Sequence, residues 1–351
     1  MERTDKSVLV IGAGVAGATA ALQLAQAGYR VHLIESQKAI GGHAADMGCK
    51  ATDRCLRCNA CVADEIFRKV QTCENVKIYT ETELDRLEDG KGKSRYIAHL
   101  KNQNIITIDI DNIVIAAGYT EYDPAENNLY GYGLAKNVIT GIEAEKQLAQ
   151  NQQITRPSDG QRPKRIAFVQ CVGSRTEEIY RRIEDVNYCS TVCCSYALRI
   201  ASLLKYQAED SQITIFYMDI QNFGKNFDKF YNECKDKMTF VRSRPYEITE
   251  SENDTVEVKY TCQNENVCRQ SFDLVILSVG IRPCRDGKQL ADKLLVPIDS
   301  QGFFGIKGAE ALPDLQRAGI YAAGAIESPK DIAGSISQAK AVCAAIMSED
   351  R

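Results

Sequence analysis

The residues of this chain best suited to chemistry are its cysteines, which number 14 among 351 residues. One group consists of Cys171, Cys189, Cys193 and Cys194. Four thiolates are what a [4Fe–4S] cluster requires, one for each iron. Zinc is an alternative, although Cys₄ zinc sites usually pair two C-x₂-C motifs rather than C-x₃-C-C. Four buried thiols acting only as small apolar side chains are a third interpretation, which their crowding disfavours. We expect an iron–sulfur site.

A second group has the spacing C-x₂-C-x₂-C at Cys55, Cys58 and Cys61. This is most of a ferredoxin motif, but the fourth cysteine and its trailing proline are missing. Cys49 or Cys73 would complete a second metal site. Alternatively, Cys58 and Cys61 form a redox-active dithiol, or the segment is a surface loop with unreactive thiols. The spacing does not separate these three interpretations.

The other cysteines have simpler interpretations. Cys262 and Cys268 lie on the facing strands of a predicted hairpin, and we expect them to be packing residues. Cys234, Cys284 and Cys343 have no partner nearby in sequence. A chain of this length does not need disulfides to be stable, so clustered cysteines favour metal binding or redox chemistry in a reducing compartment.

Composition and charge exclude several classes of protein. The chain has 43 Lys and Arg against 47 Asp and Glu, a net charge of -4, and no basic block. Nucleic acid is therefore not an expected partner. With 44% hydrophobic residues the chain is too apolar to be disordered. We find no signal peptide and no membrane span, and expect a cytoplasmic protein of about two domains.

The elements that would hold a cofactor begin near the N-terminus. A strand at 6–11 leads into the sequence Gly12-Ala13-Gly14-Val15-Ala16-Gly17, then a helix to 27 and a strand at 31–34 that ends before Glu35. This is a β-α-β unit with G-x-G-x-x-G opening its helix. The helix N-terminus binds phosphates, and the acid can accept hydrogen bonds from a ribose. The pattern predicts a dinucleotide site.

A second β-α-β unit is predicted from a strand at 165–170, a helix at 191–206 and a strand at 213–218. A polar segment at 147–164 precedes it as a linker. Where a second glycine motif would stand, residues 170–175 read QCVGSR. The cysteine group therefore replaces the phosphate loop. Cys189 and Cys193 share a helical face if the helix begins early, and Cys194 requires an irregular first turn.

One order of elements occurs twice. A hairpin at 95–110 and a buried strand at 111–118 correspond to a hairpin at 256–272 and a strand at 273–280. A closing strand at 319–324 and a helix at 334–347 return to the first domain. These patterns predict an α/β fold with two Rossmann-like domains, as in thioredoxin-reductase-type flavoproteins, with β-meander hairpins. We assign residues 1–145 and 281–351 to the first domain and 146–280 to the second.

Five motifs together resemble the flavin-bearing A-type subunit of heterodisulfide reductase: QCVGSR, YCSTVCC at 188–194, YMDIQNFG at 217–224, LSVGIRP at 277–283 and PKDI at 329–332. The resemblance covers nearly the whole chain. It implies that FAD and a [4Fe–4S] cluster are the cofactors and that the cluster ligands are Cys171, Cys189, Cys193 and Cys194. The implied FAD-binding residues are Gly12, Ala13, Gly14, Val15, Ala16, Gly17, Glu35, Ser36, Gly41, Gly42, Ala117, Gly118, Gly324, Ala325, Lys330, Asp331 and Ile332.

The resemblance also has limits. The family's methanogen members carry an extra N-terminal iron–sulfur domain and ferredoxin inserts, which this sequence lacks, so electron bifurcation is not expected. Cys58 and Cys61 match a C-x-x-C of the family, whereas Cys55 has no obvious counterpart. The chain looks like the short, single-cluster form associated with a heterodisulfide-reductase-like complex of sulfur oxidisers.

That resemblance implies an oxidoreductase subunit that transfers electrons between FAD and the cluster. Its implied partners are proteins similar to the B- and C-type subunits of heterodisulfide reductase, and related two-domain flavoproteins commonly form homodimers. Two alternatives stand beside this hypothesis. One is an NAD(P)H-dependent disulfide reductase that uses Cys58 and Cys61, and the other is a flavoprotein with a structural zinc site.

Overall fold

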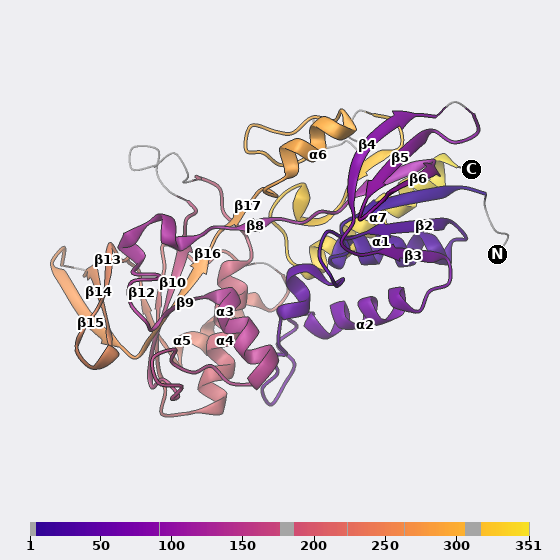
Figure 1. Cartoon of the computed structure of the whole chain (residues 1–351). Helices are drawn as coiled ribbons and strands as arrows, with labels where there is room; N and C mark the ends of the chain where they lie inside the picture. The colour runs from indigo at the N-terminus through magenta and orange to yellow at the C-terminus, as the bar shows by residue number, and fades with distance from the viewer. Residues whose placement is uncertain are drawn as a thin grey trace. The chain divides into compact units, whose positions relative to one another are not determined.

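The computed structural model describes residues 5–90, 92–175, 186–222, 224–262, 264–305 and 317–350. Contacts divide the chain into two compact units (Figure 1). The first comprises residues 1–45, 59–120 and 282–351, and the second comprises 46–58 and 121–281. The chain passes between the units in β8 (Thr120–Glu121) and β17 (Ile281–Arg282), which pair as a two-stranded sheet. Among the described helices, none is long and apolar enough to span a membrane.

The first unit is built on a parallel sheet with the strand order β18-β7-β1-β2-β3. Its strands are β1 (Ser7–Ile11), β2 (Arg30–Ile34), β3 (Val76–Tyr79), β7 (Asn112–Ile115) and β18 (Ile320–Ala322). Every residue of β1, β7 and β18 is buried, as expected for a parallel sheet covered on both faces. The helices α1 (Val15–Gln26), α2 (Ala60–Gln71) and α7 (Ile332–Glu349) pack on one face.

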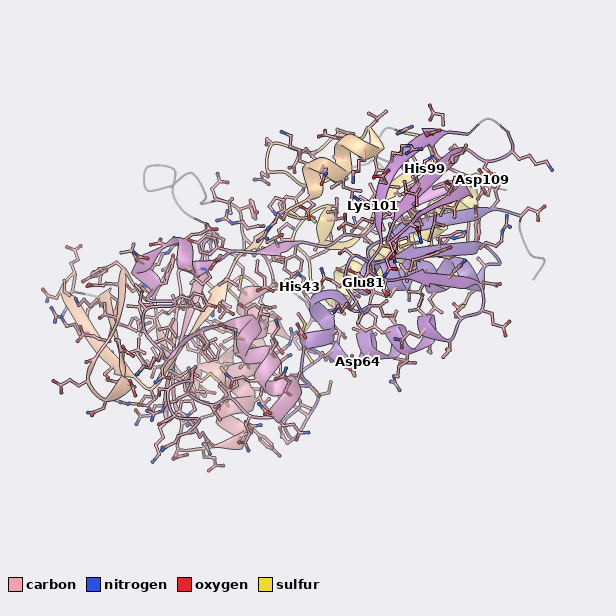
Figure 2. All side chains as sticks on the ribbon, in the orientation of Figure 1. His43, Asp64, Glu81, His99, Lys101 and Asp109 are labelled. Carbon is pink, nitrogen blue, oxygen red and sulfur yellow. A yellow bond between two sulfur atoms is a disulfide. The ribbon has the colours of Figure 1, made fainter. Side chains whose placement is uncertain are left out.

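A three-stranded antiparallel sheet covers the other face of this parallel sheet, together with α6 (Gly287–Leu294). It consists of β4 (Glu83–Asp89), β5 (Tyr96–Lys101) and β6 (Ile105–Ile110). Figure 2 labels His99 and Lys101 on β5 and Asp109 on β6. The imidazole of His99 lies 3.2 Å from Glu88 of β4 and 3.1 Å from the Thr107 hydroxyl of β6, so it links all three strands. The sequence predicts β5 and β6 but not the charged edge strand β4.

The second unit repeats this arrangement of layers. Its parallel sheet has the order β12-β11-β10-β16-β9, with β9 (Val138–Thr140), β10 (Arg165–Val172), β11 (Gln212–Phe216), β12 (Thr239–Val241) and β16 (Leu274–Val279). One face packs against α3 (Gly141–Asn151), α4 (Cys193–Gln207) and α5 (Phe227–Lys235). The other packs against the antiparallel strands β13 (Glu247–Glu250), β14 (Val256–Thr261) and β15 (Val267–Phe272).

The division of the chain differs from the sequence-based boundaries in two places. Residues 121–145 lie in the second unit, because β9 pairs in parallel with β16 and α3 packs beside it. Residues 46–58, which we call the strap, also belong to the second unit, although they come from the middle of the predicted first domain. Local sequence patterns do not report these contacts, since the partner strands and helices are about 100 or more residues away along the chain.

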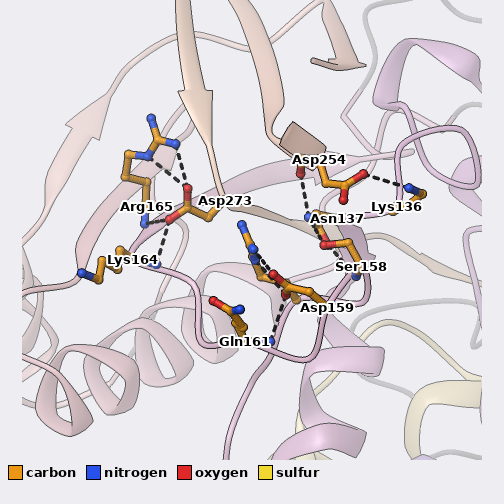
Figure 3. A network of polar contacts seen from close by, with 10 residues as sticks. Lys136, Asn137, Ser158, Asp159, Gln161, Lys164, Arg165, Asp254 and Asp273 are labelled. Atoms are coloured by element: carbon orange, nitrogen blue, oxygen red, sulfur yellow. Dashed lines mark hydrogen bonds and ion pairs between the residues drawn. The ribbon is translucent and has the colours of Figure 1, made fainter. Parts of the chain in front are cut away.

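The predicted linker at 147–164 is also more ordered than its polarity indicates. Its first residues complete α3, which ends at Asn151. Beyond them, a polar network attaches the segment to the sheet of the second unit (Figure 3). The Asn137 amide donates to Ser158 at 2.9 Å, and the carboxylate of Asp273 accepts from the backbone N–H groups of Lys164 and Arg165 at 2.9 and 2.8 Å.

Candidate functional site

The glycine-rich loop of the first unit has the geometry of a dinucleotide cradle. It connects β1 to α1. Some glycines of the motif allow close packing of the backbone, and another leaves space for a ligand. A Cβ at Gly17 would lie 1.8 Å from the Gly12 carbonyl oxygen, so only glycine fits there. A Cβ at Gly14 would meet nothing within 4 Å, which leaves the N-terminus of α1 open to a ligand. The unpaired N–H groups of that terminus favour phosphate.

Glu35 stands at the end of β2, beside this loop, as the sequence predicts. Its carboxylate accepts hydrogen bonds from the N–H of Ala13 at 2.8 Å and the N–H of Gln37 at 2.9 Å. The Ser36 hydroxyl lies 3.3 Å from the same carboxylate. These contacts hold an acid next to the phosphate-binding turn, which is where a carboxylate can reach a ribose.

Two further predicted segments border the same loop. The N–H of Gly41 donates to the Ala13 carbonyl at 2.9 Å, and a Cβ at Gly42 would lie 3.3 Å from Gly14 Cα. The ring of His43, labelled in Figure 2, stacks on Tyr119 with a centroid distance of 4.1 Å. This stacking joins the segment after Gly42 to the turn that contains Ala117 and Gly118.

The last predicted segment connects β18 to α7. A Cβ at Gly324 would lie 2.6 Å from the Cβ of Ala16, so this turn packs on the first turn of α1. The ammonium of Lys330 donates to the Gly324 carbonyl at 3.0 Å and to Glu327 at 2.6 Å, while Asp331 caps α7 by accepting from the N–H of Gly334 at 2.7 Å. The structure thus gathers the predicted FAD residues around two helix N-termini in one unit, and the donor set fits a dinucleotide.

The cysteines of the second unit lie where β10 ends and α4 begins. Cys171 is the penultimate residue of β10 rather than part of a loop, and its φ of 61° is left-handed. Gly173 and Arg175 are left-handed as well, with φ of 70° and 57°. Turns that combine such conformations turn successive N–H groups toward one point, and many iron–sulfur sites use them.

The start of α4 departs from two expectations. The helix begins at Cys193, so Cys189 precedes it and does not share a helical face with Cys193. An irregular first turn was expected because Cys193 and Cys194 are adjacent, but both lie inside the helix, and the left-handed residue is Thr191, which precedes it with a φ of 60°. The N–H of Thr191 donates to the Cys189 sulfur at 3.3 Å. A left-handed residue before the helix lets the chain fold back toward the strand end.

The electrostatic environment of the four thiols indicates that they lie close together. Burial raises the pKa of Cys193, and the nearby thiols of Cys194, Cys171 and Cys189 raise it further. Burial also raises the pKa of Cys194 to about 12, although the backbone N–H of Gln221 acts in the opposite direction. A bound cation or metal cluster would relieve this cost by stabilising the thiolates.

Two arginines accompany the cysteines. Burial raises the pKa of Cys171, while the guanidinium groups of Arg175 and Arg244 lower it. Arg175 forms a two-pronged ion pair with Asp219. Arg244 donates to the Cys171 carbonyl at 3.1 Å and to the Tyr130 hydroxyl at 3.0 Å. Buried thiolates would therefore meet fixed positive charge.

An aromatic ring covers the turn where a second nucleotide would be cradled. A Cβ at Gly173 would lie 2.2 Å from the Tyr122 ring, and the N–H of Tyr122 donates to the Gly280 carbonyl at 2.9 Å. Tyr122 is buried. With one glycine left in the sequence QCVGSR and an aromatic ring packed on it, this end of the sheet lacks the open approach seen at Gly14.

The described residues do not by themselves form a recognisable metal site. Across the described ranges, no three His, Cys, Asp or Glu side chains are placed to hold one metal ion. A tetrahedral zinc site binds its thiolates to one ion, whereas each thiolate of a [4Fe–4S] cluster binds a different iron. Three buried thiols, the half-buried thiol of Cys189 and two arginines have the chemistry to hold a cluster.

The remaining cysteines are placed as follows. Cys49 and Cys55 are exposed on the strap, where Cys58 also lies, and Cys61 is an exposed residue in the first turn of α2. The strap and α2 belong to different units, so the Cys58–Cys61 dithiol stays a prediction. Cys262 and Cys268 are joined in a disulfide with a Cα–Cα distance of 5.8 Å, which corrects their interpretation as packing residues. Cys268 pairs with Tyr260 across the hairpin, and Cys262, two residues after Tyr260, lies at a diagonal position within bonding range.

Known proteins share both the sequence and the fold of this chain. Residues 6–169 match the pyridine nucleotide-disulphide oxidoreductase family, and the match ends two residues before Cys171. The chain is 29% identical to the A-type subunit of the H(2):CoB-CoM heterodisulfide,ferredoxin reductase of Methanothermobacter marburgensis, over 97% of this chain and 63% of that protein. It is 31% identical to an iron-sulfur A-type subunit of the CoB--CoM heterodisulfide reductase of Methanopyrus kandleri, over 97% of this chain and 64% of that protein. The chain is thus similar, over nearly its whole length, to the A-type subunits of heterodisulfide reductases.

The chain spans slightly less than two thirds of the length of those relatives. Solved structures agree on the fold. Lactococcus lactis thioredoxin reductase superposes with a TM-score of 0.64 at 15% identity, covering 98% of both chains. T. acidophilum thioredoxin reductase gives a TM-score of 0.62 at 15% identity, covering 99% of both. The predicted fold, α/β with two Rossmann-like units and antiparallel hairpins, is confirmed.

Sequence reasoning missed three residues around the cysteines of the second unit. Asp219 lies in the YMDIQNFG motif, which we used only as a mark of resemblance. Arg244 and Tyr122 lie in segments without a recognisable pattern. Their roles follow from long-range contacts with residues 171–175, which no local signal in the sequence indicates.

Proposed function

We propose that this protein is an FAD- and [4Fe–4S]-containing electron-transfer subunit of a heterodisulfide-reductase-like complex. The observation that supports it most is the substitution in the second unit. Where the fold would hold a second dinucleotide, three buried thiols, the half-buried thiol of Cys189 and two arginines lie near the start of α4, and the ring of Tyr122 packs on Gly173. The cluster ligands in this proposal are Cys171, Cys189, Cys193 and Cys194.

The two cofactors would supply two-electron and one-electron chemistry respectively, so a protein that holds both can convert between them. The chain's own residues would bind and orient these cofactors. The open N-terminus of α1 at Gly14 would bind the FAD pyrophosphate, and Glu35 would accept from the ribose. Arg175 and Arg244 would hold positive charge near Cys171 and so stabilise thiolates in a buried place.

The partners and the pathway belong to the same proposal. Relatives named as A-type subunits of heterodisulfide reductases imply other subunits, and we propose proteins similar to the B- and C-type subunits as the partners. We also propose a homodimer and a role in sulfur oxidation, on the resemblance to the short, single-cluster form. Cys58 and Cys61 are proposed as accessory redox thiols.

The test is cofactor analysis of protein that is purified and reconstituted anaerobically. We expect one FAD, four irons and four acid-labile sulfides per chain. Cys171→Ala and Cys193→Ala should each lose most of the iron and keep the FAD. Cys234→Ala removes a buried thiol of the same unit outside the group and should keep both cofactors. Wild-type protein with flavin but no iron and sulfide would refute the proposal.

The same preparation separates the two alternatives. Stoichiometric zinc without sulfide would favour a structural zinc site. Rapid bleaching of the flavin by NADH, saturating at micromolar NADH, would favour a pyridine-nucleotide disulfide reductase. We expect neither, since the described thiols are not placed for a single ion and Tyr122 packs on the turn that would cradle the nucleotide.

A further inference from the structure

Three buried polar side chains beside the cysteines have hydrogen-bonding atoms without a partner among the described residues. They are both amide atoms of Gln170 and the hydroxyls of Ser174 and Ser278. Gln170 is 3% exposed, Ser174 is 1% exposed and Ser278 is fully buried. An unpaired buried polar group costs free energy. Folded proteins seldom leave several together, and a bound group that accepts hydrogen bonds would satisfy the amide N–H₂ of Gln170 and both hydroxyls, although not the Gln170 amide oxygen.

The pairing of β10 with β16 brings two of these residues together at the carboxyl ends of the strands. Phe168 pairs with Ile276, and both pack in the core on the α4 side of the sheet. Side chains alternate between the two faces of a strand, so Ser278, two residues after Ile276, points toward that face. Gln170 lies beside Ser278, where the register of β10 against β16 shifts between Val169 and Val172. The first turn of α4 above that face contains Cys193 and Cys194.

Ser174 lies on the other side of the same turn. A Cβ at Gly280 would lie 3.1 Å from the Cβ of Ser174 and 3.2 Å from the hydroxyl of Ser190, so these residues are neighbours. The Ser190 hydroxyl has a partner, since it accepts from the N–H of Ile281 at 2.8 Å. Ser174 has none among the described residues, although it sits between Cys171 and the segment that leads into α4.

We propose that Gln170, Ser174 and Ser278 donate hydrogen bonds to the sulfur atoms of the cluster and thereby raise its reduction potential. The inference rests on the proposed function, because it requires the cluster. Donors near the sulfurs stabilise the reduced form, which carries the additional negative charge. The three side chains ligate no iron in this scheme. They are positioning residues that set how readily the cluster accepts an electron.

The experiment measures the midpoint potential of the reconstituted full-length protein by dithionite titration followed by EPR. Gln170→Leu and Ser278→Ala should each keep the iron and sulfide content of the wild type. Each should lower the equilibrium constant for cluster reduction by up to about tenfold, a shift of about 59 mV to more negative potential for one electron. In pulsed EPR on protein labelled with amide-¹⁵N glutamine, a coupling present in the wild type should vanish in Gln170→Leu.

Ser211→Ala is the matched control, because Ser211 is a buried serine of the same unit just before β11, at the opposite end of the sheet. Its potential should equal that of the wild type. Full iron content with unshifted potentials in both site variants would overturn the inference and leave the proposed function intact. That result is expected if ordered water, rather than the cluster, pairs with these side chains. Iron loss in the small Ser278→Ala change would also overturn it, since a non-ligand should not control ligation. A wild type without iron would overturn both.

Discussion

Individual residues in this protein show how burial and pairing together decide the energy of a charge. Asp273 precedes β16 and faces the start of β10 (Figure 3). Burial acts to raise the pKa of its carboxyl group, but the hydrogen bonds from Arg165 and Lys164 outweigh burial and hold the pKa below its usual value. The carboxylate fixes the register at which the polar segment before β10 enters the sheet.

Asp273→Asn should lower the free energy of unfolding by about 1–3 kcal/mol at pH 7. The amide N–H₂ cannot accept the hydrogen bonds that one carboxylate oxygen now accepts from Lys164 and Arg165. A lowered pKa stabilises the folded state above the pKa of the unfolded chain, about 3.9, and this contribution is lost as the pH falls through the folded value. The unfolding free energies of the variant and the wild type, measured with denaturant, should therefore converge as the pH falls below the unfolded-state pKa and through the lower pKa of the folded state.

Asp210→Asn is the control for that comparison. Asp210 is paired with Arg162 at 3.4 Å, but its side chain is 68% exposed. Its removal should change the unfolding free energy by less than about 0.5 kcal/mol at either pH. Equal effects of the two substitutions would contradict the role given to Asp273.

Among the elements, the turn between β10 and the segment before α4 carries the difference between the two units. In the first unit, the corresponding turn packs its glycines against backbone and leaves Gly14 open. In the second, Gly173 packs against the ring of Tyr122 and cysteines border it. The two turns occupy equivalent positions in two similar sheets, so their side chains rather than their topology determine what each binds.

Gly173→Ala should destabilise the second unit by about 2–3 kcal/mol, because the added methyl group meets the Tyr122 ring at a left-handed backbone position. Gly133→Ala is a matched control with a φ of 75° and nothing within 4 Å, so it should cost only about 1 kcal/mol. In the double variant Tyr122→Ala/Gly173→Ala, the loss should be less than the sum of the single losses. Equal losses for the two glycine variants would show that Tyr122 does not crowd the turn.

At the scale of the whole molecule, the strap stands out because it belongs to the second unit, whereas the residues just before and just after it belong to the first. A buried ion pair holds it, with Lys50 Nζ 2.5 Å from Glu145 of α3 and both side chains at most 3% exposed. Burial raises the pKa of Glu145, and Lys50 lowers it. Arg199 of α4 donates to the Leu56 carbonyl at 2.9 Å, and Arg54 pairs with Glu233 of α5. The second unit thus holds the segment that carries Cys49, Cys55 and Cys58.

Lys50→Met should release the strap, because it leaves a buried carboxylate without its cation, a change that typically costs about 3–5 kcal/mol. Hydrogen exchange read by mass spectrometry should become faster at residues 46–58, while β1 and β2 keep their protection. The double variant Lys50→Met/Glu145→Leu removes both charges and should restore slow exchange. Unchanged exchange in Lys50→Met would mean that the other two contacts hold the strap by themselves.

The sequence by itself determined the first β-α-β unit with Glu35, the two hairpins with their buried strands and the grouping of four cysteines at one strand end. These features are carried by patterns within about 30 residues, which strand alternation, helix periodicity and glycine spacing report directly. The irregular first turn expected at Cys194 was wrong, since Cys193 and Cys194 both lie inside α4 and the left-handed residue, Thr191, precedes the helix.

Only the tertiary structure decided the rest. It placed the strap and residues 121–145 in the second unit, packed Tyr122 on Gly173, brought Arg244 to Cys171 and joined Cys262 to Cys268. Apart from the disulfide, each of these depends on groups that are distant along the chain and meet through packing and long-range hydrogen bonds. The free energies of these contacts depend on burial and geometry, which local sequence patterns do not indicate.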